Sequence, residues 1–320
     1  MLQQTRVETV IPYYERFIEA FPTVTALADA PLDAVLQRWS GLGYYRRARM
    51  LHGAAQEVRD RFGGALPATA AELRSLTGVG AYTAGAVASI AYGEAAPLVD
   101  GNVARVFARI FALEEDVRAG AGLAKVWALA GDLVPATDAG DYNQALMELG
   151  ATVCVPREPR CLLCPVAELC EARARGLEGT LPILRPKAEP RVLPRTALVA
   201  RQGERVWIAQ RGEVGTFAGM WEPPSVAPGE RPDELTALTA VLGLRPADLE
   251  AVEERGSVVH VLSHRRLEVT VLAARTRTAS AVTAPGGGDY VQARAVEPSA
   301  LGEYALTTYA RKVLAKVSRF

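Results

Sequence analysis

Hydrophobic residues recur every three or four positions through the first 150 residues, which is the spacing of one buried helix face. Segments 103–113, 122–134 and 141–154 carry this pattern. In residues 1–22 it is present from the first residue, and it places on one side Leu2, Val7, Val10, Ile11, Tyr14 and Phe17. The N-terminal half of the chain is therefore predicted to be all-α.

The pattern changes after Thr196 to short strands, expected at 196–201, 205–211, 258–264, 266–275 and 289–296. Helices are expected there only near 232–242 and at the C-terminus, so this half predicts an α+β domain. Upstream, prolines recur at every fourth position and favour an extended, semi-rigid linker; they are Pro182, Pro186, Pro190 and Pro194. We therefore predict a helical domain at 1–175, a linker at 176–195 and an α+β domain at 196–320.

A helical hairpin is predicted around residues 69–92. Thr69 and Glu72 have the spacing of a capping box, so a helix should begin there and end at the turn Gly78-Val79-Gly80. The two glycines allow positive φ and leave no Cβ to block an approaching molecule. The buried side of the second helix is expected to contain Ala84, Val87, Ala88 and Ala91. Its free N-terminal N–H groups suit a DNA phosphate, whereas an ordinary glycine turn between two helices is the alternative.

Asp100 lies at the start of the next predicted helix, in the run Val99-Asp100-Gly101-Asn102-Val103. An isolated aspartate in this place is more often an N-cap than a catalyst. The position alone therefore leaves both roles open.

A second glycine turn, Gly41-Leu42-Gly43, is followed by Tyr44, Tyr45 and the arginines at 46, 47 and 49. Arginines pair with phosphates, and an apolar or aromatic side chain can fill the gap left by a flipped base. A helix junction with core tyrosines is the alternative interpretation.

The cysteines of the chain lie within 17 residues, in the pattern C-x6-C-x2-C-x5-C; they are Cys154, Cys161, Cys164 and Cys170. Disulfides are rare in a reducing compartment, so four thiols so close together favour one metal centre. Zinc and an iron–sulfur cluster both accept four cysteines, and both remain candidates at this point.

Composition narrows the class of protein. The 320 residues and 49% hydrophobic content suit two packed cores, and the formal net charge of zero neither supports nor excludes DNA binding. No apolar run approaches the roughly 20 residues of a membrane span, and no leader pattern is present. We therefore expect a cytoplasmic protein with no membrane contact, and a monomer.

Together these motifs resemble the MutY family of adenine DNA glycosylases, within the helix-hairpin-helix glycosylase superfamily. The match includes M-L-Q-Q-T at 1–5, G-L-G-Y-Y at 41–45, the hairpin, V-D-G-N-V at 99–103 and the cysteines. The resemblance implies a 4Fe–4S cluster on the cysteines. It also implies DNA contacts from Gln4, Thr5, Leu42, Tyr44, Gly78, Gly80 and Asn102, with Leu42 and Tyr44 as wedges beside the lesion.

The same resemblance implies catalytic roles for Asp100 and Tyr82. Asp100 would face the sugar of an extruded nucleotide and stabilise its cationic form. Tyr82 would be a hydrogen-bond donor in the same pocket. Endonuclease III has a lysine at that position, which forms a Schiff base and cleaves the strand, and a tyrosine cannot do this.

The run from Arg205 to Val226 resembles the start of Nudix hydrolases. The glutamate-rich helix that binds magnesium in that family is replaced by ERPDELTALTAVLGL at 230–244, so this domain should bind rather than hydrolyse. In MutY such a domain recognises 8-oxoguanine through an F/L-S-H motif. Leu262-Ser263-His264 corresponds to it, and Ser263 would contact the base, whereas a strand-ending serine is the alternative.

The resemblance thus implies removal of adenine mispaired with 8-oxoguanine or guanine in duplex DNA, by hydrolysis and without strand cleavage. The MutY general acid is a glutamate two residues before M-L-Q-Q-T, and this motif begins at Met1. We therefore expect either that the start was assigned at an internal methionine or that the chain is truncated and weakly active. A mismatch-binding module without catalysis is the alternative, and an endonuclease III-like lyase is a weaker one.

Overall fold

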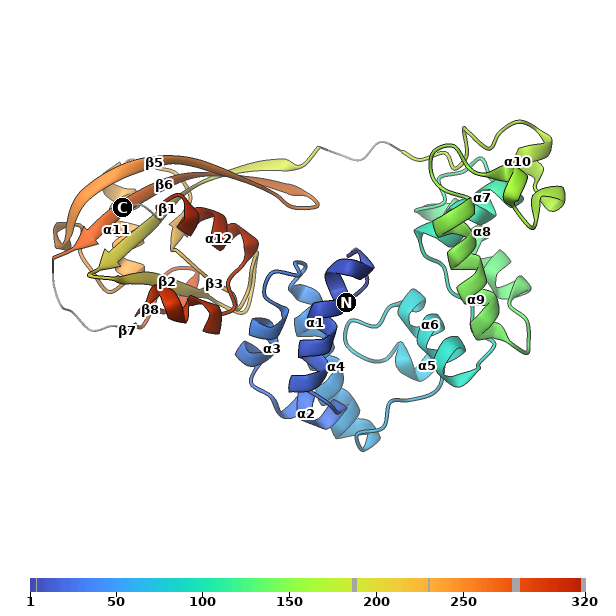
Figure 1. The fold of residues 1–320 in the computed structure, drawn as a ribbon, viewed down its shortest axis with the longest axis horizontal. Helices are drawn as coiled ribbons and strands as arrows, with labels where there is room; N and C mark the ends of the chain where they lie inside the picture. The colour runs from blue at the N-terminus through green and yellow to red at the C-terminus, as the bar shows by residue number, and fades with distance from the viewer. Residues whose placement is uncertain (4, 186–188, 230, 278–282, 318–320) are drawn as a thin grey trace. The chain divides into compact units, whose positions relative to one another are not determined.

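The computed structural model describes residues 1–3, 5–185, 189–229, 231–277 and 283–317. It contains two compact units (Figure 1). One, the helical unit, is formed by residues 53–187, and the other, the mixed unit, by residues 1–52 together with 188–320. These units differ from the predicted domains because the N-terminal helices group with the C-terminal sheet. Among the described residues, no helix is long and apolar enough to cross a membrane.

The helical unit is built around α7 (Gly101–Ile110). Buried residues of α7 pack against α8 (Gly120–Leu133) and α9 (Ala139–Glu148), forming one hydrophobic core. The unit also contains α5 (Ala70–Leu73) and α6 (Ala81–Tyr92). After α9 the chain forms a π-helical turn at Leu149–Val153, short 3₁₀ turns at Cys161–Leu163 and Ala167–Leu169, and α10 (Glu171–Ala174).

Helix α6 packs through small residues rather than through the face that its pattern predicts. Ala84 and Ala88 are buried as expected, but Ala91 is exposed and Val87 is only partly buried. Gly85 is buried instead, because a Cβ there would lie 2.0 Å from the carbonyl oxygen of Pro97. A hydrophobicity pattern does not weigh a glycine, so it could not find this close contact.

The mixed unit begins with α1 (Val7–Ala20), α2 (Val24–Asp29), α3 (Leu32–Trp39) and the start of α4 (Arg46–Phe62). The prediction that the helix starts at the first residue is wrong, because α1 begins at Val7. Only Val10 and Phe17 of its predicted apolar side are buried. Phe17 packs edge-on against the fully buried Trp39 of α3, and the expected core positions that are instead exposed are Leu2, Val7, Ile11 and Tyr14.

The sheet of the mixed unit has the strand order β5-β6-β1-β2-β8-β7 (Figure 1). These strands are β5 (Leu249–Val261), β6 (Arg265–Thr276), β1 (Arg191–Gln202), β2 (Arg205–Arg211), β8 (Tyr290–Val296) and β7 (Thr283–Ala284). Two short strands, β3 (Trp221–Glu222) and β4 (Ser225–Val226), pair with β2 and β1. Short 3₁₀ turns lie at Pro246–Asp248 and Pro298–Glu303.

Strands β1 and β6 run parallel, from the pair Arg191↔Arg265 to the pair Arg201↔Arg275. Strand β1 therefore includes the last five residues of the predicted linker. Its residues 196–200 are buried without a break, so both faces of the sheet are covered at this point. Helices α11 (Arg231–Val241) and α12 (Thr308–Ala315) both pack on the sheet, which confirms the α+β class.

Replacing Gly85 with alanine should destabilise the helical unit. Alanine favours a helix by roughly 0.5–1 kcal/mol over glycine, but the added Cβ would collide with the backbone of Pro97. Overpacking of this kind costs about 1–3 kcal/mol, so we expect a lower unfolding temperature. The matched control is Gly131→Ala in α8, where a Cβ meets open space and stability should hold or rise slightly. Equal stability of the two variants would contradict the close contact.

Candidate functional site

The helix-hairpin-helix joins α5 to α6 in the helical unit. Thr69 caps α5, since its Oγ1 accepts a hydrogen bond from Glu72 N at 3.2 Å, and it donates to Glu72 Oε2 at 2.8 Å. Gly78 has φ +77° and therefore occupies the left-handed region that favours glycine. Gly80 has φ −86° and is the N-cap of α6, so the expected positive φ applies to Gly78 alone. Both glycines are exposed, which leaves the N-terminus of α6 open to an anion.

Asp100 is the N-cap of α7. Its Oδ1 accepts hydrogen bonds from Asn102 N at 2.8 Å and Val103 N at 2.7 Å. Its Oδ2 accepts one, from Asn102 Nδ2 at 3.1 Å. The side chain is partly exposed. One carboxylate oxygen is therefore used by the helix, while the other retains capacity for a further partner.

Tyr82, in the first turn of α6, lies within electrostatic reach of Asp100. Burial, and then the negative charge of Asp100, raise the pKa of the Tyr82 hydroxyl. That hydroxyl lies 3.6 Å from Met147 Sδ. Tyr82 therefore remains a neutral hydrogen-bond donor near the carboxylate at physiological pH.

A chain of hydrogen bonds connects Asp100 to the first cysteine. Arg105 Nη2 donates to Asn102 Oδ1 at 2.9 Å, and Arg105 Nε donates to the carbonyl oxygen of Cys154 at 2.8 Å. Arg105 Nη2 also reaches the carbonyl oxygen of Gly150 at 2.7 Å. Gly150 must lack a side chain, because a Cβ would lie 2.6 Å from Asn102 Cβ. The side chain of Asn102 orients Asp100, and Arg105 connects Asn102 to the start of the cysteine loop.

Arg109, one helical turn further along α7, is 2% exposed and holds both ends of the cysteine loop. Its Nη1 donates to Val155 O at 2.8 Å and lies 3.3 Å from Cys154 Sγ. Its Nε donates to Leu181 O at 2.9 Å, beyond the last cysteine. At that end Cys170 Sγ donates to the carbonyl oxygen of Arg109 at 3.4 Å.

The four cysteines line one small apolar cavity of about 30 Å³, next to Arg109. None of the four forms a disulfide, and all four have intermediate exposure. Burial, followed by the carboxylate of Glu178 and the neighbouring sulfurs, raises the pKa of Cys161. Over the described ranges, no three His, Cys, Asp or Glu side chains are grouped as ligands of a single ion. All four cysteines nevertheless line one cavity, and four thiolates are a ligand set that zinc or an iron–sulfur cluster accepts.

In the mixed unit, Arg47 joins the two N-terminal motifs. Its guanidinium donates to the carbonyl oxygen of Met1 at 2.8 Å, to Thr5 Oγ1 at 3.1 Å and to Gly43 O at 3.4 Å. It also contacts the carbonyl oxygen of Gln3. The guanidinium lies over the ring of Tyr44, 5.2 Å from its centroid. The segment before α1 is thereby held against the glycine turn.

The two expected wedge residues differ in exposure. Tyr44 is 47% exposed and has φ +50°, whereas Leu42 is 6% exposed and belongs to the core. The structure therefore presents Tyr44 on the surface and keeps Leu42 inside. Thr5 is partly exposed, and Gln4 lies outside the described residues.

Ser263 is exposed in the turn between β5 and β6. The turn is closed by a hydrogen bond from Leu262 N to Arg265 O at 2.7 Å. On the helix α11, Glu234 is buried, and its carboxylate accepts hydrogen bonds from Thr196 Oγ1 and Gly229 N, both at 3.0 Å. Glu234 is thus used inside the domain as a hydrogen-bond acceptor.

Comparison with known proteins agrees with these features. Residues 1–128 match the HhH-GPD superfamily of base excision DNA repair proteins, and residues 195–316 match the NUDIX domain. The adenine DNA glycosylase of Mus musculus is 39% identical over 339 residues, covering 91% of this chain and 66% of the mouse protein. That of Arabidopsis thaliana is 38% identical, covering 85% of this chain and 50% of the plant protein.

The chain belongs to the MutY family of adenine DNA glycosylases. It spans between about half and two thirds of the length of these curated relatives. A solved structure of a thermostable thymine-DNA glycosylase superposes with a TM-score of 0.50 and 29% identity, over 54% of this chain and 80% of that one. The predicted family and fold class are therefore confirmed.

Three arginines that organise this MutY-family chain were not predicted as such. Arg47 was expected only as one of several phosphate partners, and Arg105 and Arg109 were not singled out. The sequence does contain an indication of Arg105 and Arg109, because these two arginines lie four residues apart on an otherwise apolar helix. A cation at a core position requires buried acceptors, but only the fold identifies them.

Arg47 should be needed to hold the N-terminal segment. Replacing it with glutamine removes hydrogen bonds to Met1 and Thr5, so the Arg6–Val7 bond should be exposed more often. Trypsin should then cut it about fivefold faster, as expected for a loss of roughly 1 kcal/mol of local stability. Arg46→Gln is the matched control, because Arg46 is exposed. Cleavage at the same rate in both variants would show that Arg47 does not anchor the segment.

Proposed function

We propose that this chain acts in base excision repair and removes adenine paired with 8-oxoguanine or guanine by hydrolysing the N-glycosidic bond. The observation that carries the proposal is the geometry of Asp100, a partly exposed carboxylate fixed at the N-terminus of α7. Adenine leaves when a ring nitrogen is protonated, and the sugar that remains is cationic. An anion fixed beside that sugar lowers the barrier because its position is set before the charge develops.

The two carboxylate oxygens of Asp100 have different hydrogen-bond partners, so they can have different roles. Oδ1 caps the helix by accepting hydrogen bonds from the N–H groups of Asn102 and Val103. Among the described residues Oδ2 accepts only from Asn102, and it would face the sugar. The N-cap and the catalyst, which sequence reasoning set as alternatives, are therefore compatible roles of one residue.

Tyr82 favours simple hydrolysis over strand cleavage. A Schiff base requires an amine, and the group that α6 brings near Asp100 is a hydroxyl with a raised pKa. Tyr82 would donate a hydrogen bond within the pocket. This supports a monofunctional glycosylase rather than a lyase.

The remaining proposed contacts bind duplex DNA. The exposed hairpin at Gly78 and Gly80 would receive a backbone phosphate at the N-terminus of α6. Tyr44 would act as the wedge beside the flipped adenine, with Leu42 supporting the turn from inside. Thr5, Gln4 and Asn102 remain proposed contacts from the family resemblance. A chain that binds the mismatch without excising adenine is the second candidate, since the proposed contacts at Tyr44, Gly78 and Gly80 do not involve Asp100.

The four cysteines would hold a 4Fe–4S cluster. They surround one cavity, and Arg109 places a guanidinium 3.3 Å from Cys154 Sγ, where it would stabilise a thiolate ligand. The cluster would fix the loop, and hydrolysis of the N-glycosidic bond requires no electron. Arg109 would join this loop to α7, the helix that Asp100 caps.

Adenine excision should depend on Asp100 and on a general acid. The family resemblance expects the acid in a glutamate two positions before Met1. Placing that residue ahead of the chain should raise single-turnover release of adenine by about 10²- to 10⁴-fold, the usual contribution of a general acid. In the extended chain, Asp100→Asn keeps an oxygen for the cap but removes the charge, so excision should fall by about 10²- to 10³-fold.

Duplex affinity measured beside excision separates the two candidate functions. Asp100→Asn should bind an A:8-oxoguanine duplex nearly as well as the parent chain. An Asp100→Asn variant that excises normally would reduce Asp100 to a helix cap. An extended chain that binds the mismatch and releases no adenine would favour the binding module.

Ser263 should affect discrimination between lesions. Ser263→Ala removes one exposed hydroxyl from the β5–β6 turn. We expect the preference for A:8-oxoguanine over A:G duplexes to fall by about fivefold, the size of one modest hydrogen bond. Ser299→Ala alters an exposed serine elsewhere in the same domain and should have no effect. An unchanged preference in Ser263→Ala would remove this residue from lesion recognition.

The cluster is tested by metal content. Protein purified without oxygen should contain about four iron and four sulfide per chain, with a broad visible absorption. Removing the metal should release the cysteine loop and lower the unfolding temperature. Stoichiometric zinc in place of iron would refute the cluster.

A further inference from the structure

A cavity of about 230 Å³ lies in the mixed unit, and none of the residues that line it has a role in the proposed glycosylase function. Polar side chains that line it are Arg195, Arg211, Ser225, Thr216, Arg265 and Tyr309, together with the carboxylate of Asp289. Drug-sized ligands occupy roughly 300–1,000 Å³. The cavity therefore suits a small ligand with hydrogen-bond acceptors.

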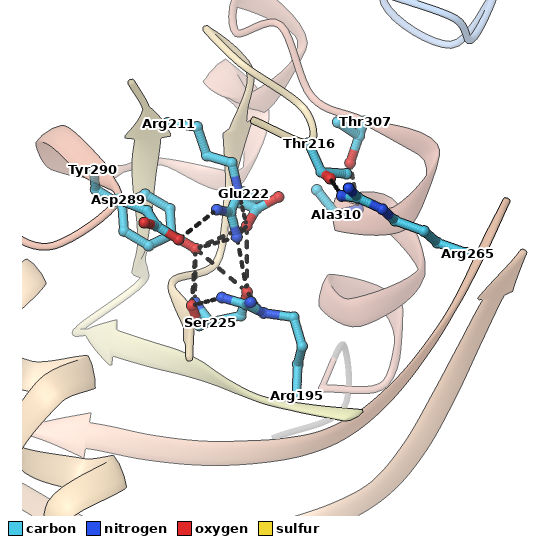
Figure 2. Close-up of polar contacts among 10 residues, drawn as sticks. All are labelled: Arg195, Arg211, Thr216, Glu222, Ser225, Arg265, Asp289, Tyr290, Thr307 and Ala310. Atoms are coloured by element: carbon cyan, nitrogen blue, oxygen red, sulfur yellow. Dashed lines mark hydrogen bonds and ion pairs between the residues drawn. The ribbon is translucent and has the colours of Figure 1, made fainter. Parts of the chain in front are cut away.

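The charge of the cavity walls favours an anion. Arg211 is compensated, because its guanidinium lies 2.8 Å from the carboxylate of Glu222 and 3.2 Å from that of Asp289. Arg195 instead donates to the hydroxyl and carbonyl oxygens of Ser225, at 3.2 and 2.6 Å, as Figure 2 shows. Arg265 donates to Thr216 Oγ1 at 2.5 Å (Figure 2). Neither of these two arginines has a carboxylate partner in the part of the chain that the structure describes, so two uncompensated cations line one cavity.

Tyr309 adds a neutral donor. It is 1% exposed, its ring stacks on that of Phe217 at 5.6 Å, and its hydroxyl makes no hydrogen bond with any residue that the structure describes. A buried hydroxyl without a partner is destabilising, and most buried polar groups in folded proteins are paired. An acceptor bound in the cavity could supply the missing partner.

We infer that this cavity is an oxyanion site, which binds a phosphate group between Arg195, Arg265 and the Tyr309 hydroxyl. Guanidinium groups bind phosphate through parallel, charge-assisted hydrogen bonds. The phosphate can come from a free phosphate compound or from the DNA backbone. The DNA source rests on the proposed function, and it is favoured by Ser263, which lies two residues before Arg265 in the same hairpin.

The test uses the full chain and inorganic phosphate, titrated at constant ionic strength against chloride and followed by calorimetry. Saturable binding is expected. Arg195→Gln, Arg265→Gln and Tyr309→Phe should each weaken it by about tenfold or more, since each removes a donor to a charged acceptor. Tyr309→Phe keeps the buried ring, so it should fold normally.

Arg266→Gln is the matched control. Arg266 neighbours Arg265 on β6, where successive side chains point to opposite faces, and it pairs with Glu268 at 2.9 Å. Its loss should leave phosphate binding unchanged. Absence of saturation would overturn the inference, and so would an equal weakening by Arg266→Gln.

Duplex binding by the same variants identifies the source of the phosphate. Weaker binding of an A:8-oxoguanine duplex by Arg195→Gln and Tyr309→Phe would assign the site to the DNA backbone. Unchanged duplex binding with lost phosphate binding would assign it to a free phosphate compound. A chain that binds phosphate but releases no adenine would refute the proposed catalysis and leave the oxyanion site standing.

Discussion

The buried guanidinium of Arg109 is the interaction on which the helical unit depends. It bonds to carbonyl oxygens on both sides of the cysteine loop, at Val155 and Leu181, and lies against Cys154 Sγ. Hydrogen bonds from a charged donor contribute about 1.5–3 kcal/mol each, and losing a buried partner leaves the remaining groups unsatisfied. A cysteine loop with little regular structure is thereby fixed to a helix of the hydrophobic core.

The same helix begins at the proposed catalytic carboxylate. Asp100 caps α7, Asn102 orients Asp100, and Arg105 connects Asn102 to Cys154 and Gly150. A change in the cysteine loop would therefore alter the position of Asp100 through a few hydrogen bonds. A metal cluster held by this loop, as proposed above, would therefore act as a scaffold, because the proposed hydrolysis transfers no electron.

In the mixed unit a buried arginine pairs with a buried carboxylate, whereas Arg109 of the helical unit donates to backbone carbonyl oxygens. Glu222 is fully buried, and one of its oxygens accepts from Arg211 and, at 2.8 Å, from Tyr290 (Figure 2). The glutamates that would hold magnesium in a Nudix hydrolase are not present on α11, where Glu234 serves as an internal acceptor. The mixed unit therefore contains buried, paired polar groups beside β2. Ser263, in contrast, is exposed in the turn between β5 and β6.

The sequence by itself determined the family, the two structural classes and the local signals of function. It also located β1, β2, β6 and β8, but it missed the first nine residues of β5 (Leu249–Val261). The hairpin, the N-cap aspartate and the cysteine spacing are short-range patterns, and each involves residues that the backbone holds close together in any compact state. Only the tertiary structure showed that Leu42 is buried while Tyr44 is exposed, and that Gly85 lies against Pro97. It alone also paired Arg109 with a carbonyl 72 residues away and enclosed the arginine-lined cavity. Such contacts join segments far apart in the chain, and no periodicity within one segment specifies which distant backbone will meet it.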